Sequence, residues 1–405
     1  YDLKEGGQMV SVQLPERITA DGGIISPTHV AVVAGSIVVN DSRSGYVYYS
    51  LPYPLANDMR TMYVMDGDKP SYMPDGVTPR TSQFPSREHV FEDDYHVQKY
   101  FNTESSSDNI NGLYAVGPTL YVFGPKTVEI WQRGSGEFEE WIRTSYTAQN
   151  GFGLEAPDSV AFSGSLVYFV SSGAQYGKAV MMASGTTYKK ISDDWLDEKL
   201  MREKASSAFG FCYSVGEHNF YVLQIPGIGE TWVYDTIDGG WHQRTSRDPK
   251  SGIEGQWRAR SVQYWHEKFW AFTVDGCWCE FGGYWSEDYP DGTSLPMVRH
   301  RQTAVIVDDL RPFTFEELTV ECNVGSWDDY ELQPKLLLEV SKDGGNTFGN
   351  IRSASMGRTG NYSQRVRFMN LGYCRLCVLR LTYSHPTEFV ISKASVRAEA
   401  TAEEM

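Results

Sequence analysis

The side chains that could perform acid–base chemistry are mostly neighbouring carboxylates. Such pairs are common and include Asp93-Asp94, Glu139-Glu140, Asp193-Asp194, Asp308-Asp309, Glu316-Glu317 and Asp328-Asp329. Neighbouring residues of a β-strand point to opposite faces, so the two carboxylates of a pair are badly placed to share a proton. We expect them to lie in solvated turns and rims, and the sequence predicts no catalytic residue.

Cysteine spacing comes nearest to a metal-binding pattern. Cys374 and Cys377 have CxxC spacing, and Cys277 with Cys279 would complete a four-cysteine zinc set. The stretch YCRLCVLRLTY, however, has the pattern of one β-strand, in which residues three apart point to opposite faces. We therefore expect reduced thiols without zinc.

Histidines and glycines give no stronger signal. None of the eight histidines has HxH or HExxH spacing, and His89 and His96 are seven residues apart in an irregular stretch. The glycines of GPKTVEIWQRGSG and SGIEGQ match neither a P-loop nor a dinucleotide-binding turn. The sequence thus predicts no metal site and no cofactor.

One motif, SKDGGNTF, is close to the Asp-box hairpin of sialidase propellers. Such enzymes carry several boxes, an arginine cluster and a Tyr–Glu pair, whereas this chain has one box outside its repeats. The same residue types build a turn, because serine and aspartate bond backbone groups, glycines adopt positive φ and an aromatic ring packs beneath. We predict a structural hairpin made by Ser341, Asp343, Gly344, Gly345, Thr347 and Phe348. A glycan-binding or sialidase-like propeller is the alternative.

The elements around these residues read as all-β. The chain has 11 Trp, 25 Tyr and 38 Gly among 405 residues, which favours aromatic strands joined by tight turns. A unit of apolar run, Gly-containing turn and aromatic-rich run recurs, as in THVAVVAGSIVVND and GLYAVGPTLYVFGP. The central strands of its five copies lie near Val38, Leu120, Leu166, Phe220 and Phe269. After a first gap of double length, the spacing of about 46 to 54 residues predicts a β-propeller with at least five recognisable blades.

Two regions depart from this repeat. Residues 51–111 have no sustained period and predict a long irregular insert, ordered by a partner or a neighbouring subunit. Beyond residue 298, about six longer strands alternate apolar and polar residues, which predicts a C-terminal β-sandwich-like module, with a divergent closing module of the propeller as the alternative. We assign residues 1–298 to the propeller and 299–405 to the module.

Two local features have structural explanations. SDDWLDEKLMREK predicts a helix that Ser192 can cap, with Trp195, Leu196 and Leu200 on its buried side. The strand, Asp-Gly-Gly turn and Trp241 that follow resemble the outer hairpin of a kelch-type blade, in which the tryptophan wedges between neighbouring blades.

Charge excludes one class of function. The 36 Lys and Arg against 52 Asp and Glu give a net charge of −16, which is poorly suited to gripping nucleic acid through its phosphates. No apolar run approaches the 18 residues of a membrane span. The chain begins at Tyr1, so we expect a fragment or a processed form.

Collinear stretches across about nine tenths of the chain resemble the packaged-DNA stabilisation protein, or tail hub (nozzle) protein, of short-tailed podoviral bacteriophages. The best anchors are NINGLYAVGPTLYVFGPKTVEIWQRGSG, KKISDDWLDEKL with HNFYVLQIPGIGETWVYD, and LLLEVSKDGGNTFGN with the strands that follow it.

This resemblance implies a virion protein, assembled in the host bacterial cytoplasm, that forms a homohexameric ring. Such a hub docks below the portal and head-to-tail adaptor and holds tailspikes or fibres. It closes the DNA channel together with a tail needle or plug and conducts DNA without reading its sequence. The family is not enzymatic. A generic interaction propeller is a further alternative.

Overall fold

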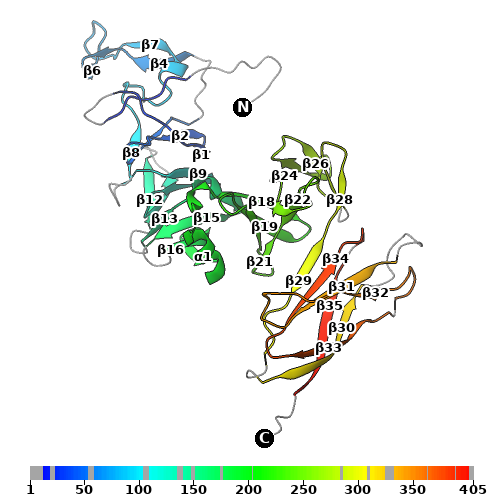
Figure 1. Ribbon diagram of the computed structural model, residues 1–405. Coiled ribbons are helices and arrows are strands. Elements are labelled where there is room, and N and C mark those ends of the chain that lie inside the picture. The colour runs from blue at the N-terminus through cyan, green and yellow to red at the C-terminus, as the bar shows by residue number, and fades with distance from the viewer. Residues whose placement is uncertain are drawn as a thin grey trace. The chain divides into compact units, whose positions relative to one another are not determined.

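The computed structural model describes residues 12–18, 23–52, 59–103, 109–134, 140–146, 151–173, 177–202, 204–282, 286–307, 311–323, 333–362, 364–387 and 389–400. The chain divides into two compact units (Figure 1). The first contains Tyr1–Thr245 and Gly255–Ser261, and the second contains Ser246–Glu254 and Val262–Met405.

Four sheets follow one another along the first unit. The next sheet in the chain is smaller and lies mostly in the second unit. The first has the order β1 (Val30–Val33), β2 (Ser36–Asn40), β3 (Tyr46–Tyr49), β8 (Tyr100–Asn102). The second has the order β12 (Trp141–Tyr146), β11 (Val128–Arg133), β10 (Thr119–Phe123), β9 (Gly112–Val116). The third consists of β13 (Phe152–Leu154), β15 (Leu166–Gly173), β16 (Gly177–Ser184) and β17 (Thr187–Lys190), with β14 (Ala161–Ser163) also paired to β15.

The fourth sheet consists of β18 (Phe209–Val215), β19 (His218–Ile225), β20 (Glu230–Asp235) and β21 (Gly240–Gln243). The smaller sheet consists of β24 (Ala259–Trp265), β25 (Lys268–Thr273) and β26 (Trp278–Glu280). Strands that are consecutive in the chain are mostly neighbours in these sheets, as in the blades of a propeller. The five predicted central strands are confirmed as β2, β10, β15, β19 and β25.

Apolar clusters join each of the four larger sheets to the next. One cluster joins β2 to β10. In the next cluster, the rings of Phe123 in β10 and Phe169 in β15 meet edge to face at 5.1 Å. In the third, Tyr168 of β15 and Tyr221 of β19 stack at 4.9 Å. Such aromatic pairs add about 0.5–1.5 kcal/mol beyond the burial of their surface, so the sheets hold one another in chain order.

Backbones of neighbouring sheets approach closely at two glycines. A Cβ on Gly153 of β13 would lie 2.3 Å from the carbonyl oxygen of Gly124. A Cβ on Gly210 of β18 would lie 2.4 Å from the carbonyl oxygen of Ser159, which also accepts a 2.9 Å hydrogen bond from the Tyr221 hydroxyl. Only a residue without a side chain fits such an approach.

Trp241 links two of these sheets, which confirms its predicted packing role. Its Nε1 donates a 2.7 Å hydrogen bond to the carbonyl of Ile191, which directly follows β17 of the third sheet. Its ring lies 5.3 Å from that of Tyr234 in β20. The residue therefore joins the fourth sheet to the third by both a hydrogen bond and apolar contact.

The helix α1 (Asp194–Arg202) lies against β16. Leu196 and Leu200 are fully buried, while Trp195 is 38% exposed and contacts a tryptophan ring of β20. The predicted cap was wrong, because the first helical amides bond to the carbonyl of Asp193. The hydroxyl of Ser192 instead accepts a 2.9 Å hydrogen bond from an amide of β16, and so fixes the start of the helix to that strand.

The segment between β3 and β8 is an excursion from the first sheet. It contains the two-stranded ribbons β4 (Met59–Tyr63) with β7 (Thr81–Pro85) and β5 (Met65–Asp66) with β6 (Lys69–Pro70), followed by the 3₁₀ turn η1 (Ser86–Glu88). Val90 and Phe91 are buried in a cluster with Val39 and Tyr48 of the first sheet. β8 falls within the range 51–111 that the sequence assigned to the insert, yet it completes the first sheet.

The second unit ends in two sheets that share one apolar cluster. The first has the order β29 (Arg299–Gln302), β34 (Val378–Tyr383), β31 (Lys335–Ser341), β32 (Arg352–Ser355). The second has the order β33 (Val366–Cys374), β30 (Phe313–Cys322), β35 (Ile391–Ala400). Their shared cluster includes Phe315 and Val320 of β30, Leu336 and Leu338 of β31 and Tyr383 of β34. Two sheets around one core form a sandwich, as predicted, although β32 was not predicted.

The remaining strands form two two-stranded ribbons. They are β22 (Thr245–Arg247) with β23 (Glu254–Gln256) and β27 (Ser286–Asp288) with β28 (Ser294–Pro296). Two 3₁₀ turns also occur, η2 (Pro157–Ser159) and η3 (Ala205–Ser207). In the described part of the chain, no helix has the length and apolar character needed to cross a bilayer. A domain division between residues 298 and 299 stays a prediction.

Candidate functional site

The SKDGGNTF segment forms a turn held by its own side chains directly after β31. Asp343 Oδ1 accepts hydrogen bonds from the Ser341 hydroxyl at 2.6 Å and from the Thr347 amide at 2.9 Å. Its Oδ2 accepts one from the Thr347 hydroxyl at 2.6 Å. Gly344 and Gly345 adopt φ of +75° and +103°, values that side chains with a Cβ disfavour.

These contacts leave the carboxylate little capacity for chemistry. The hydroxyl of Ser341, followed by the hydroxyl and amide of Thr347, lowers the pKa of Asp343 well below its usual range. The ring of Phe348 lies under the guanidinium of Arg380, whose carbon is 3.5 Å from the ring centroid. The geometry is that of a self-contained hairpin turn, and its contribution to folding stays a prediction.

The adjacent carboxylates are largely engaged in ion pairs or turns where the structure describes them. Asp94 pairs with Arg60 at 2.7 Å. Glu316 and Glu317 both pair with Arg397, at 3.0 and 2.9 Å. The expectation that neighbouring acids point apart was wrong there, because a β-bulge between Phe315 and Glu317 turns both toward one arginine. Asp308-Asp309 and Asp328-Asp329 lie outside the described residues, as does Glu139.

The CRLC segment is a turn rather than part of one strand. Cys374 ends β33, and Cys377 precedes β34. Both are buried. Burial raises the pKa of Cys377 to about 12, which keeps the thiol protonated near neutral pH. All six cysteines are free, and no described group of three or more metal-ligating side chains contains a cysteine.

Three side chains that sequence reasoning separated do meet in the excursion. His89 Nδ1 lies 2.8 Å from Glu92 Oε2, and His96 Nδ1 lies 3.5 Å from the same oxygen. The two imidazole rings are 5.0 Å apart, and the ring of Phe84 packs edge-on against both. The seven-residue spacing does not predict this contact, because an irregular loop brings the two histidines together.

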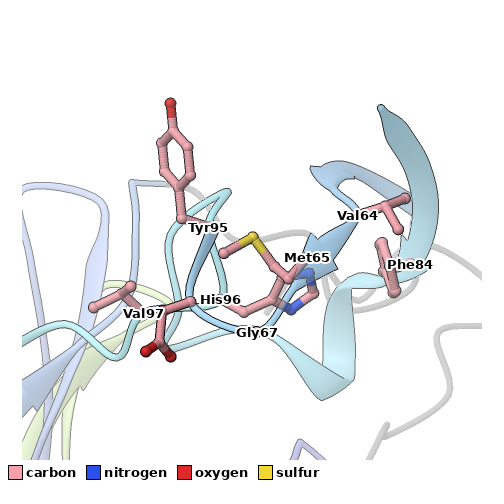
Figure 2. A pocket seen from close by; sticks show the side chains of 8 residues that line it. Val64, Met65, Gly67, Phe84, Tyr95, His96 and Val97 are labelled. Atoms are coloured by element: carbon pink, nitrogen blue, oxygen red, sulfur yellow. The ribbon is translucent and has the colours of Figure 1, made fainter. Parts of the chain in front are cut away.

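A hollow of about 490 Å³ lies beside this group (Figure 2). It is lined by Val64, Met65, Gly67, Asp68, Phe84, Tyr95, His96 and Val97. Its walls come from the short ribbons and the loop that ends at β8, so the whole hollow belongs to the excursion from the first sheet.

Family comparisons match both parts of the chain. The family model described as bacteriophage P22 Gp10, beta-propeller, matches residues 90–273, and the one described as bacteriophage P22 Gp10, beta-sandwich, matches residues 299–399. Together they cover more than half of the 405 residues. No curated protein matches the chain.

Solved structures with partial likeness include three of different functions. The WD40 domain of SCAP from fission yeast aligns with a TM-score of 0.28 and 10% identity over 89% of this chain and 95% of that one. A mutant Trypanosoma rangeli sialidase aligns with a TM-score of 0.20 and 9% identity over 95% of this chain and 94% of that one. A glycoside hydrolase family 43 arabinoxylan arabinofuranohydrolase from Bacillus subtilis aligns with a TM-score of 0.22 and 7% identity over 91% of this chain and 78% of that one. Scores this low carry no argument about activity.

The two family matches stand in the chain order that the strand patterns predicted, a propeller followed by a sandwich-like module. The chain therefore belongs to the bacteriophage P22 Gp10 family of packaged-DNA stabilisation proteins, and it is a structural protein of a phage tail.

Proposed function

We propose that this chain forms the hub or nozzle ring of a short phage tail. Six copies surround the tail axis below the portal and head-to-tail adaptor, retain the packaged DNA, and conduct it at ejection. The outside of the ring anchors tailspikes or fibres, and a needle or plug closes its far end. The observation that carries the proposal is the match of both the propeller and the sandwich to one tail protein family.

The charge of the chain supports a conduit rather than a DNA clamp. A net charge of −16 gives weak or repulsive walls, past which DNA slides without being held. Retention then depends on a closed channel and not on phosphate contacts. Raising the salt concentration should therefore leave retention unchanged, whereas binding through phosphates weakens steeply with salt.

A mechanical role also agrees with the candidate chemistry. The Asp343 carboxylate is held inside its own turn, and Glu316 and Glu317 are held by Arg397. We therefore propose that the chain is not an enzyme and that the hairpin serves the fold of the C-terminal sandwich.

The experiment uses DNA-filled heads that carry the portal and adaptor but lack this protein. Incubation with the purified chain should lower the fraction of DNA that becomes accessible to nuclease, and it should do so equally at low and high salt. An unrelated protein of similar charge is the control. Leakage that the chain does not slow would refute the retention function.

A further inference from the structure

The loop from His89 to Val97 is built to hold His96 in a fixed direction. Asp93 Oδ1 accepts hydrogen bonds from the amides of Tyr95 and Val97, at 2.9 and 3.0 Å. His96 itself adopts φ of +59°, a left-handed conformation that few residues other than glycine take. This conformation costs free energy, and the surrounding turn must maintain it.

The orientation of His96 determines which of its nitrogens faces Glu92. The His96 Nε2 lies 3.1 Å from the carbonyl oxygen of Tyr63, and it must carry a hydrogen because a carbonyl oxygen only accepts. The other ring nitrogen, Nδ1, faces the carboxylate of Glu92 at 3.5 Å.

The contact with Tyr63 is also the arrangement that zinc-binding histidines use. A ligating histidine almost always donates its second ring N–H to a carbonyl or carboxylate, which fixes the tautomer and the ring direction. Donors around a tetrahedral zinc ion are about 3.3 Å apart, given bonds of about 2.0–2.1 Å. The separations of 2.8 and 3.5 Å from Glu92 Oε2 bracket that value, and all three donor atoms lie within 4.8 Å of one another.

We propose that His89, Glu92 and His96 bind one Zn²⁺ ion per chain. Two imidazoles and one carboxylate are a donor set that zinc accepts, with a fourth position left for water. The three side chains are 18–24% exposed, so the ion and its water can reach them.

A bound ion would fasten the loop to the ribbon beneath it. Tyr63 belongs to β4, and Phe84, which packs against both imidazoles, belongs to β7. The loop also carries Val90 and Phe91 into the cluster with the first sheet. Zinc would therefore order the excursion within a single chain. The sequence composition had instead suggested that a partner or a neighbouring subunit orders it.

The test is a zinc titration of the full chain, prepared without a histidine tag and stripped of metal, in competition with a chromophoric chelator. The wild-type chain should bind one equivalent that His96→Asn weakens by at least about tenfold. The matched control is His266→Asn, because His266 also has positive φ, +49°, and asparagine tolerates that conformation. The control should bind zinc as the wild type does.

Glu92→Gln provides a second variant, because its amide can still hydrogen-bond to His89 but is a much weaker zinc ligand than the carboxylate. It should fold as the wild type does, by circular dichroism, yet bind zinc at least about tenfold more weakly. Zinc should also slow proteolysis within residues 59–103 in the wild type and not in either site variant. Absence of a stoichiometric zinc ion, or equal affinity in the wild type and Glu92→Gln, would overturn the proposal and leave a hydrogen-bonded triad.

Discussion

Replacing Gly210 with alanine tests the close packing between the third and fourth sheets. The new Cβ would lie 2.4 Å from the carbonyl oxygen of Ser159 and 2.9 Å from both the ring edge and the hydroxyl of Tyr221. Contacts below 3.0 Å essentially do not occur for a real Cβ, so the strands must separate or the Tyr221 ring must move. Either movement disturbs the 2.9 Å hydrogen bond from Tyr221 to Ser159.

The magnitude follows from these two effects. Overpacking a close contact costs about 1–3 kcal/mol, and a buried hydroxyl that loses its partner costs about 1–3 kcal/mol more. Because the two effects share one movement, we expect the free energy of unfolding to fall by about 2–4 kcal/mol. Urea unfolding followed by tryptophan fluorescence measures this change.

Gly240→Ala is the matched control. Gly240 begins β21, its backbone has no positive φ, and a Cβ there would meet no atom within 4 Å. Its replacement should change stability by less than about 1 kcal/mol. Adding Tyr221→Phe to Gly210→Ala should cost less than the sum of the two single changes, because both act on one hydrogen bond. A Gly210→Ala chain as stable as the Gly240→Ala chain would refute the reasoning.

Three further predictions concern single side chains. Trp241→Phe keeps an aromatic ring but removes the hydrogen bond to the Ile191 carbonyl. Urea unfolding should show that the free energy of unfolding falls by about 1 kcal/mol. An unchanged midpoint would argue against the link between the two sheets. Burial raises the pKa of Cys212 from 9.0 to about 12, so its protonated thiol contributes stability that is complete below pH 9 and is lost as the pH rises toward 12. Cys212→Ala should therefore lose less stability between pH 8 and pH 10 than the wild type, and equal losses would contradict the burial. Asp343→Ala should lower the melting temperature of the C-terminal sandwich at pH 7, and the difference from wild type should shrink as the pH falls below 3.8, because hydrogen bonds lower the pKa of that carboxyl. Lys342→Ala is the control for the hairpin, and a melting temperature that responds equally to both changes would show that the turn contacts do not matter.

The repeating strands could be predicted from sequence because their signal is local. An alternating run such as Val30–Val33, in which Ala31 and Val33 are buried while Val30 and Val32 are exposed, shows its strand and its buried face directly. The turns between runs are equally visible, because Gly35 and its counterparts supply positive φ. These two signals predicted the central strands β2, β10, β15, β19 and β25 in chain order.

The errors arise where the backbone departs from its local period. The CRLC segment has the composition of a strand, yet the strand before it, β33, ends at Cys374. Near that end the backbone is irregular, because Asn370 and Gly372 adopt positive φ of +58° and +94°. β8 is only three residues long, too short to show a period of two, and pairs with β3 from the far side of a long excursion. Both features depend on contacts that no short window of sequence contains.

The meeting of His89, Glu92 and His96 was hidden for a related reason. Motif reasoning looks for ligands on one helix face or across one strand, where fixed spacing brings side chains together. Here the left-handed backbone at His96 and the carbonyl of Tyr63 set the direction of the imidazole. A positive φ at a histidine cannot be recognised from residue types alone.

The proposal that this chain is a tail hub is tested most directly by imaging it with its adaptor. The purified chain, mixed with portal and head-to-tail adaptor, should give particles in which it forms a sixfold ring below the adaptor. A chain that stays monomeric and leaves the adaptor bare under the same conditions would contradict the account.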